Sequence, residues 1–148
     1  MNQNQKRQII YYKNIWKILS NQVTLHQKNE MGKEFIRQIF YYKKYYLDFF
    51  EKQNSEVKKK FNWTLQLIAT IERIPQKFFK HITDSKGIYE IRIEVGSDIY
   101  RVFSFFDSDR LIIVINGYRK KSQKTSKNEI EIAEKIRKEY FDEKEHKQ

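Results

Sequence analysis

Two arginines and the basic segment that follows them are the side chains best suited to chemistry on a phosphate. Guanidinium groups grip phosphate oxygens with paired hydrogen bonds, and neighbouring cations stabilise the charge that builds up during phosphodiester cleavage. No acidic residue occurs between Leu111 and Asn128, so the local charge is not neutralised within the segment. The residues concerned are Arg92 and Arg101, followed by Arg119, Lys120, Lys121, Lys124 and Lys127.

Cleavage of RNA also needs a base, because the 2′-hydroxyl beside the phosphate attacks only after it loses its proton. Each positive neighbour disfavours the charged form of a lysine and lowers its pKa, a condition that Lys120, Lys121 and Lys124 meet best. His81 is the other metal-free base, but a lone histidine between helix and sheet is more often a packing residue. Lysine runs are also common on solvated surfaces, so the interpretation depends on the strands that carry the arginines.

A β-hairpin is predicted to bring the two arginines together. Residues 89–95 alternate apolar with charged side chains, Gly96-Ser97 favours a two-residue type II′ turn, and residues 98–106 return. This register places Arg92 opposite Arg101, where Glu90 and Glu94 on the same face would soften the repulsion. A second two-residue turn at Ser108-Asp109 would place Asn116 beside Arg101 and start the basic segment at the same sheet edge.

The remaining elements follow from periodicity and capping. Residues 34–42 predict a strand, residues 44–52 a short helix, and residues 55–74 a second helix capped by Asn54 or Ser55 and ended by Pro75. Trp63 and Trp16 could stack on bases, but at helical positions we expect core roles. Residues 111–115 predict a central strand. Ser126 and Glu129 open a last helix, whose expected core stripe is Ile132, Ala133, Ile136 and Tyr140 and whose charged tail frays after Phe141.

These elements predict an α/β chain of the α+β kind. We expect an antiparallel sheet of about four strands packed against an N-terminal helical hairpin, with a C-terminal helix. The 148 residues suffice for one domain, which we place at 33–148. Residues 1–32 are interpreted as an N-terminal extension that is mobile or comes from an upstream start, with Met31 as a second start.

Composition narrows the function classes. The net charge of +11 favours nucleic acid or an anionic membrane as the partner. The chain has no cysteine and only three histidines, which argues against disulfides, thiol chemistry and zinc, and we expect no cofactor. No apolar run approaches the length of a membrane span, and we expect a cytoplasmic protein.

Four segments together resemble the HigB-like branch of the RelE/ParE toxin superfamily: 87–92, 99–103, 105–107, and 117–118 running into 120–125. The resemblance extends over about residues 33–141 and implies a RelE-like fold. It also implies a metal-independent, ribosome-dependent endoribonuclease that cuts mRNA through 2′-oxygen attack, held inactive by a cognate antitoxin, which we expect to be a helix-turn-helix protein.

The resemblance also implies roles for individual residues. Arg92 and Arg101 match the sheet arginines that grip the scissile phosphate, and Lys120, Lys121 and Lys124 match the basic positions after the last strand. On this basis we assign Lys121 and Lys124 to transition-state charge and proton transfer, and Arg119, Lys120 and Lys127 to RNA binding. Thr125 stands near the position where some relatives carry a tyrosine or histidine, so the general base stays open.

Two other functions are compatible with the same residues. The ParE side of the superfamily poisons a topoisomerase such as gyrase, and such a protein would inhibit supercoiling without producing RNA fragments. A nonenzymatic RNA-binding or antitoxin-titrating protein would bind with a steep salt dependence and leave RNA intact.

Overall fold

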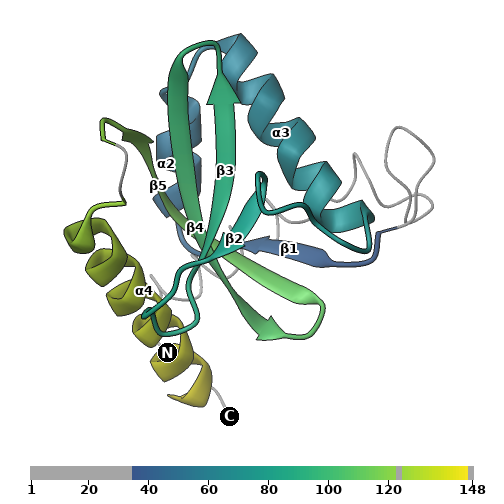
Figure 1. The fold of residues 1–148 in the computed structure, drawn as a ribbon. Helices are drawn as coiled ribbons and strands as arrows, with labels where there is room; N and C mark the ends of the chain where they lie inside the picture. The colour runs from purple at the N-terminus through teal and green to yellow at the C-terminus, as the bar shows by residue number, and fades with distance from the viewer. Residues whose placement is uncertain (1–34, 123–124, 147–148) are drawn as a thin grey trace.

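The computed structural model describes residues 35–122 and 125–146. Lys124 and the proposed extension over residues 1–32 lie outside the described residues. The elements, in chain order, are β1 (Gln38–Tyr41), α2 (Tyr45–Glu51), α3 (Ser55–Thr70), β2 (Phe79–His81), β3 (Tyr89–Val95), β4 (Asp98–Ser108), β5 (Leu111–Lys120) and α4 (Lys127–His146). The strands form one sheet in the order β1-β5-β4-β3-β2, seen in Figure 1.

The α+β class is confirmed, but the predicted sheet is wrong in two respects. The sheet of the structure has five strands instead of about four, and it is mixed rather than antiparallel because β1 pairs in parallel with β5. The missed strand, β2, has only three residues, too few to show a period-two pattern. The predicted RelE-like arrangement is compatible with this fold, although the number of strands and the placement of the helices differ.

The helical pair between β1 and β2 forms where capping and periodicity predict it. The Asn54 side chain accepts a hydrogen bond from the Val57 amide at 3.0 Å, which caps α3. The helix ends at Thr70, ahead of Pro75, and Ile71 is already extended. Arg37 donates to the carbonyls of Ile68, Ile71 and Glu72, and thereby satisfies acceptors at the end of α3.

Alternating side chains give the sheet an apolar core on each face. One face packs against α2 and α3 through residues that include Phe61, Ile93 and Val102. The other packs against α4 through residues that include Phe105 and Ala133. Gly117 lets α2 approach β5 closely, since an added Cβ would overlap the ring of Phe49. Both faces bury apolar area, which is the main favourable term in folding.

The last helix differs from its prediction in two places. Ile132 is 45% exposed and is not part of the core stripe, while Ile130 packs against the buried Ala133 and Ile136. The helix also continues past Phe141 to His146. Its end is held by Asp107, which accepts hydrogen bonds of 2.6 Å from the Tyr140 hydroxyl and the Lys144 ammonium. Burial opposes ionisation of Asp107, but these two donors outweigh it and lower its pKa.

A candidate phosphate-binding site on the sheet

The predicted hairpin is confirmed, and it places Arg92 directly opposite Arg101. A type II′ turn requires a positive φ at its first residue only. Gly96 has a φ of 60°, and Ser97 does not have a positive φ. Arg101 lies on the same face of the sheet as Phe103 and Phe105, because alternate residues of a strand point to the same side, and its partner Arg92 lies on that face too. This is the face that α4 covers farther along the sheet.

The second predicted turn is one residue out of place. β4 extends to Ser108, which pairs with Leu111, so the turn is Asp109-Arg110 rather than Ser108-Asp109. Moving a two-residue turn by one position shifts the pairing by two residues. Two register irregularities within the β4–β5 ladder cancel each other, so the neighbour of Arg101 on β5 is Tyr118 instead of Asn116. Tyr118 stacks on Phe103 with ring centroids 5.5 Å apart, and burial raises its pKa.

A buried carboxylate relieves the repulsion between the paired arginines. Glu90 is only 5% exposed, and its Oε2 lies 3.8 Å from Nε of Arg101 and 3.9 Å from Nε of Arg92. The other carboxylate oxygen accepts a hydrogen bond from the Thr125 hydroxyl. The guanidinium groups are also anchored to backbone carbonyls, Arg101 to Tyr100 at 3.0 Å and Arg92 to Gln76 at 3.4 Å. Glu90 therefore acts as a shared counterion that holds both arginines in place.

Lys120 joins this cluster from β5. It pairs with Ile99, two residues before Arg101, and therefore lies on the same face. Partial burial lowers its pKa, and the positive charges of Arg101, Arg92 and Lys80 lower it further. The pKa of Arg101, a side chain only 2% exposed, is lowered by burial and by Arg92, although a guanidinium keeps its charge at any physiological pH.

The other predicted site residues are placed less centrally. Lys121 is exposed just after β5, and Lys127 is exposed as the first residue of α4. Arg119 pairs with Tyr100 on the opposite face of the sheet and forms an ion pair with Asp98. His81 also lies on that opposite face, with its ring 5.0 Å from that of Tyr89.

Sequence reasoning missed Lys80, and it did not connect Thr125 with Glu90. Lys80 pairs with Glu90, which brings the short strand β2 onto the same face as the arginines. Its place could be predicted only once β2 had been recognised. Thr125 was considered for the position of a base, whereas the structure shows it bonded to the buried Glu90.

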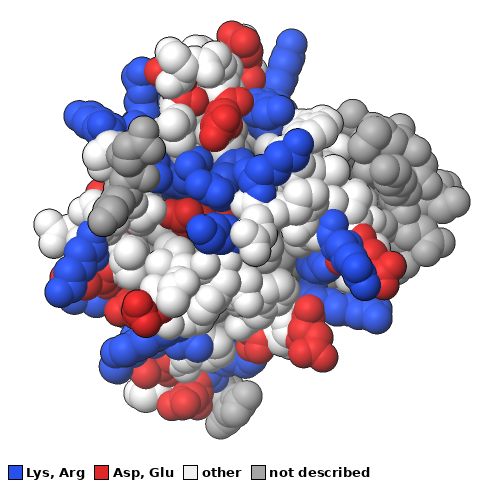
Figure 2. Space-filling model, viewed as in Figure 1, with Lys and Arg blue, Asp and Glu red and all other residues white. Residues whose placement is uncertain are grey.

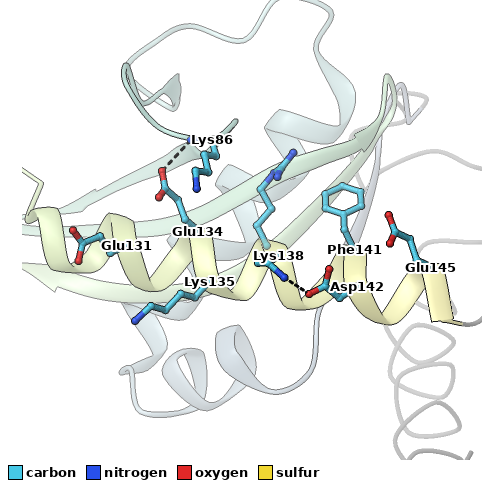
Figure 3. A pocket seen from close by; sticks show the side chains of 9 residues that line it. Lys86, Glu131, Glu134, Lys135, Lys138, Phe141, Asp142 and Glu145 are labelled. Atoms are coloured by element: carbon cyan, nitrogen blue, oxygen red, sulfur yellow. Dashed lines mark hydrogen bonds and ion pairs between the residues drawn. The ribbon is translucent and has the colours of Figure 1, made fainter.

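Figure 2 shows basic side chains gathered over the sheet on the face that carries α4. A separate hollow runs along α4 beside Lys86 (Figure 3). There, Glu134 accepts a hydrogen bond from the Lys86 amide and Lys138 pairs with Asp142, so carboxylates alternate with cations. That hollow lacks the excess of positive charge found around Arg92, Arg101 and Lys120. The described residues contain no group of three metal-ligating side chains.

The comparisons with known proteins identify the family. Residues 48–138 match the family model described as phage derived protein Gp49-like (DUF891), a range that covers more than half of the chain. The chain therefore belongs to this Gp49-like family, a toxin family of toxin-antitoxin systems within the RelE/HigB-like superfamily. A toxin of this kind has a cognate antitoxin as its partner.

A search of curated proteins gave no match. Within residues 35–122 and 125–146, none of the helices combines the length and hydropathy that crossing a bilayer would require.

Proposed function

We propose that this protein is the toxin of a type II system, acting in the cytoplasm as a metal-independent, ribosome-dependent mRNA endoribonuclease of the HigB-like branch. The main support is the convergence of Arg92, Arg101 and Lys120 from three adjacent strands on one face of the sheet. Two guanidinium groups held on a sheet, with a lysine amine beside them, are suited to binding a phosphate whose negative charge increases in the transition state.

In this mechanism the arginines grip the scissile phosphate and the amine of Lys120 takes the proton of the 2′-hydroxyl. The 2′-oxygen forms a bond to phosphorus, and the bond from phosphorus to the 5′-oxygen breaks. The ammonium of Lys121 or Lys124 gives a proton to the leaving 5′-oxygen, so the products are a 2′,3′-cyclic phosphate and a 5′-hydroxyl. The lowered pKa of Lys120 supports the first step, because more of its amine is neutral at a given pH.

The remaining basic residues have binding roles in the proposal. Lys127, exposed at the start of α4, contacts the message near the cut. Arg119, on the opposite face, contacts ribosomal RNA rather than the scissile phosphate. The cognate antitoxin, proposed to be a helix-turn-helix protein, inactivates the toxin by covering these groups.

A cleavage assay with purified ribosomes and a defined message tests the proposal. The wild-type chain should produce fragments that end in a 2′,3′-cyclic phosphate, and should leave the same message intact without ribosomes. Arg101→Ala should lower the cleavage rate by about 100- to 1000-fold, the usual effect of removing one transition-state donor. Arg110→Ala is the matched control, since Arg110 is exposed in the turn at the other end of β4.

Three outcomes would contradict this function. An intact message with the wild-type chain would exclude cleavage, and equal rates for wild type and Arg101→Ala would exclude the arginine cluster as its site. Inhibition of gyrase supercoiling without RNA fragments would favour the ParE-like alternative. Binding of RNA that Arg101→Ala weakens, without any product, would favour the nonenzymatic alternative.

A further inference from the structure

The exposure of Trp63 contradicts the prediction that this residue lies in the core. It is 42% exposed, whereas its helix α3 turns Val57, Phe61 and Leu65 inward. Among the described residues the other large apolar side chain with such exposure is Ile132 on α4. An exposed indole forgoes a large gain from burial, and tryptophan is enriched where proteins bind partners.

An aromatic contact links Trp63 to the arginine cluster. Its ring meets that of Phe78 edge to face, with centroids 5.6 Å apart. The Phe78 carbonyl accepts a hydrogen bond of 2.8 Å from the Arg92 amide, so Phe78 is the neighbour of Arg92 across the sheet edge. Because adjacent strands lie about 5 Å apart, the backbone of Phe78 is close to that of Arg92 at this edge of the sheet, while Trp63 stands on α3, the helix that packs against the opposite face.

Cations accompany both rings. The Lys60 ammonium lies 4.4 Å from the centroid of the Trp63 ring, and the Lys77 ammonium lies 4.8 Å from that of Phe78. Aromatic rings flanked by lysines are the combination by which proteins hold single-stranded nucleic acid, since bases stack on the rings while cations bind the backbone.

A hollow of about 540 Å³ lies beside Trp63, between the start of α3 and the β3–β4 turn. Two carboxylates, Glu56 and Glu94, line it together with Lys59 and Lys60. Carboxylates repel a phosphate but accept hydrogen bonds from the amino and imino groups of a base. The lining therefore offers hydrogen-bond acceptors to a base beside the Trp63 ring.

We infer that Trp63 and Phe78 form a stacking subsite for one nucleobase of single-stranded RNA, at the sheet edge where the backbone of Phe78 lies beside that of Arg92. The inference rests on the proposed function, because it takes RNA as the substrate. The subsite would supply affinity for an unstacked base presented by a message in extended form.

Binding of a short single-stranded RNA whose 2′-hydroxyls are methylated, so that it resists cleavage, tests the subsite separately from catalysis. Trp63→Ala should weaken binding by about 5- to 100-fold, and Trp63→Phe should weaken it much less. Ile132→Ala, the matched control at the other exposed apolar residue, should bind as wild type. An abasic chain of the same length should bind equally to wild type and Trp63→Ala.

Fluorescence gives a second readout. The chain has two tryptophans, so Trp16→Phe leaves Trp63 as the sole tryptophan, and stacking should quench its emission. Unchanged affinity in Trp63→Ala together with unquenched emission would overturn the subsite. If Arg101→Ala still lost binding in that case, the proposed function would stand without it. If Arg101→Ala also bound normally and cleaved the ribosome-bound message at the wild-type rate, both proposals would fail.

Discussion

Replacing Glu90 by glutamine tests whether this carboxylate is the counterion that lets two arginines face each other across the hairpin. The amide keeps the shape of the side chain and an oxygen for the Thr125 hydroxyl, but it removes the negative charge. Arg92 and Arg101, whose Nε atoms lie 3.9 and 3.8 Å from the carboxylate, would then repel each other without compensation.

The expected loss of stability is large. At an effective dielectric constant of about 20, unit charges about 3.8 Å apart attract by about 4 kcal/mol, and breaking a buried ion pair costs about 3–5 kcal/mol. Arg92 is 28% exposed, so water and ions recover part of this. We expect the free energy of unfolding to fall by about 3 kcal/mol, which leaves a typical domain folded but much closer to unfolding.

Urea unfolding followed by circular dichroism measures this effect. Glu94→Gln is the matched control, because Glu94 lies on the same strand and face but is exposed, and its loss should be below about 0.5 kcal/mol. Added inorganic phosphate should stabilise Glu90→Gln more than wild type, since the unpaired guanidinium groups then bind the anion. If Glu90→Gln and Glu94→Gln unfolded at the same urea concentration, the shared-counterion argument would be refuted.

Two further predictions concern β5. Cleavage by wild type should increase as the pH rises, because the neutral amine of Lys120 increases, and the lowered pKa moves this rise below the pH of an ordinary lysine. A pH-rate profile should lose the rise in Lys120→Met and keep it in Lys121→Met, and identical profiles for the two would contradict the assignment. Gly117→Ala should lower stability by about 1–3 kcal/mol through overlap with Phe49, and Phe49→Leu should restore part of it in thermal unfolding. An unchanged melting temperature in Gly117→Ala would show that the ring gives way without strain.

The central hairpin could be predicted from the sequence because its determinants are local. Alternation assigns each side chain to a face, and a two-residue Gly-Ser turn sets the register without reference to the rest of the chain. These two facts sufficed to place Arg92 opposite Arg101. The capped start of α3 at Asn54 was predictable for the same reason.

What the sequence did not reveal depends on tertiary contacts. Asp107, Ser108 and Asp109 are all good turn formers, and Asp107 is drawn into β4, where it also holds α4 through Tyr140 and Lys144. Strand β2 exists only as a partner for the edge of β3, and three residues carry no periodic signal of their own. Trp63 was expected in the core because it is a large apolar residue in a helix, but α3 turns Val57, Phe61 and Leu65 inward and leaves Trp63 against Phe78.

The basic side chains at the end of β5 lie on both faces of the sheet. Successive residues of a strand point to opposite faces, so Lys120 joins the arginines while Arg119 is directed to the other side of the sheet. The cations that surround Glu90 come from four strands, with Lys80 on β2, Arg92 on β3, Arg101 on β4 and Lys120 on β5. The positive charge at the proposed site thus depends on how the strands pair. The number of lysines after the last strand overstates the number of cations on the face that carries the arginines. This is why the register of the sheet, rather than the net charge of the chain, determines which cations stand at the proposed site.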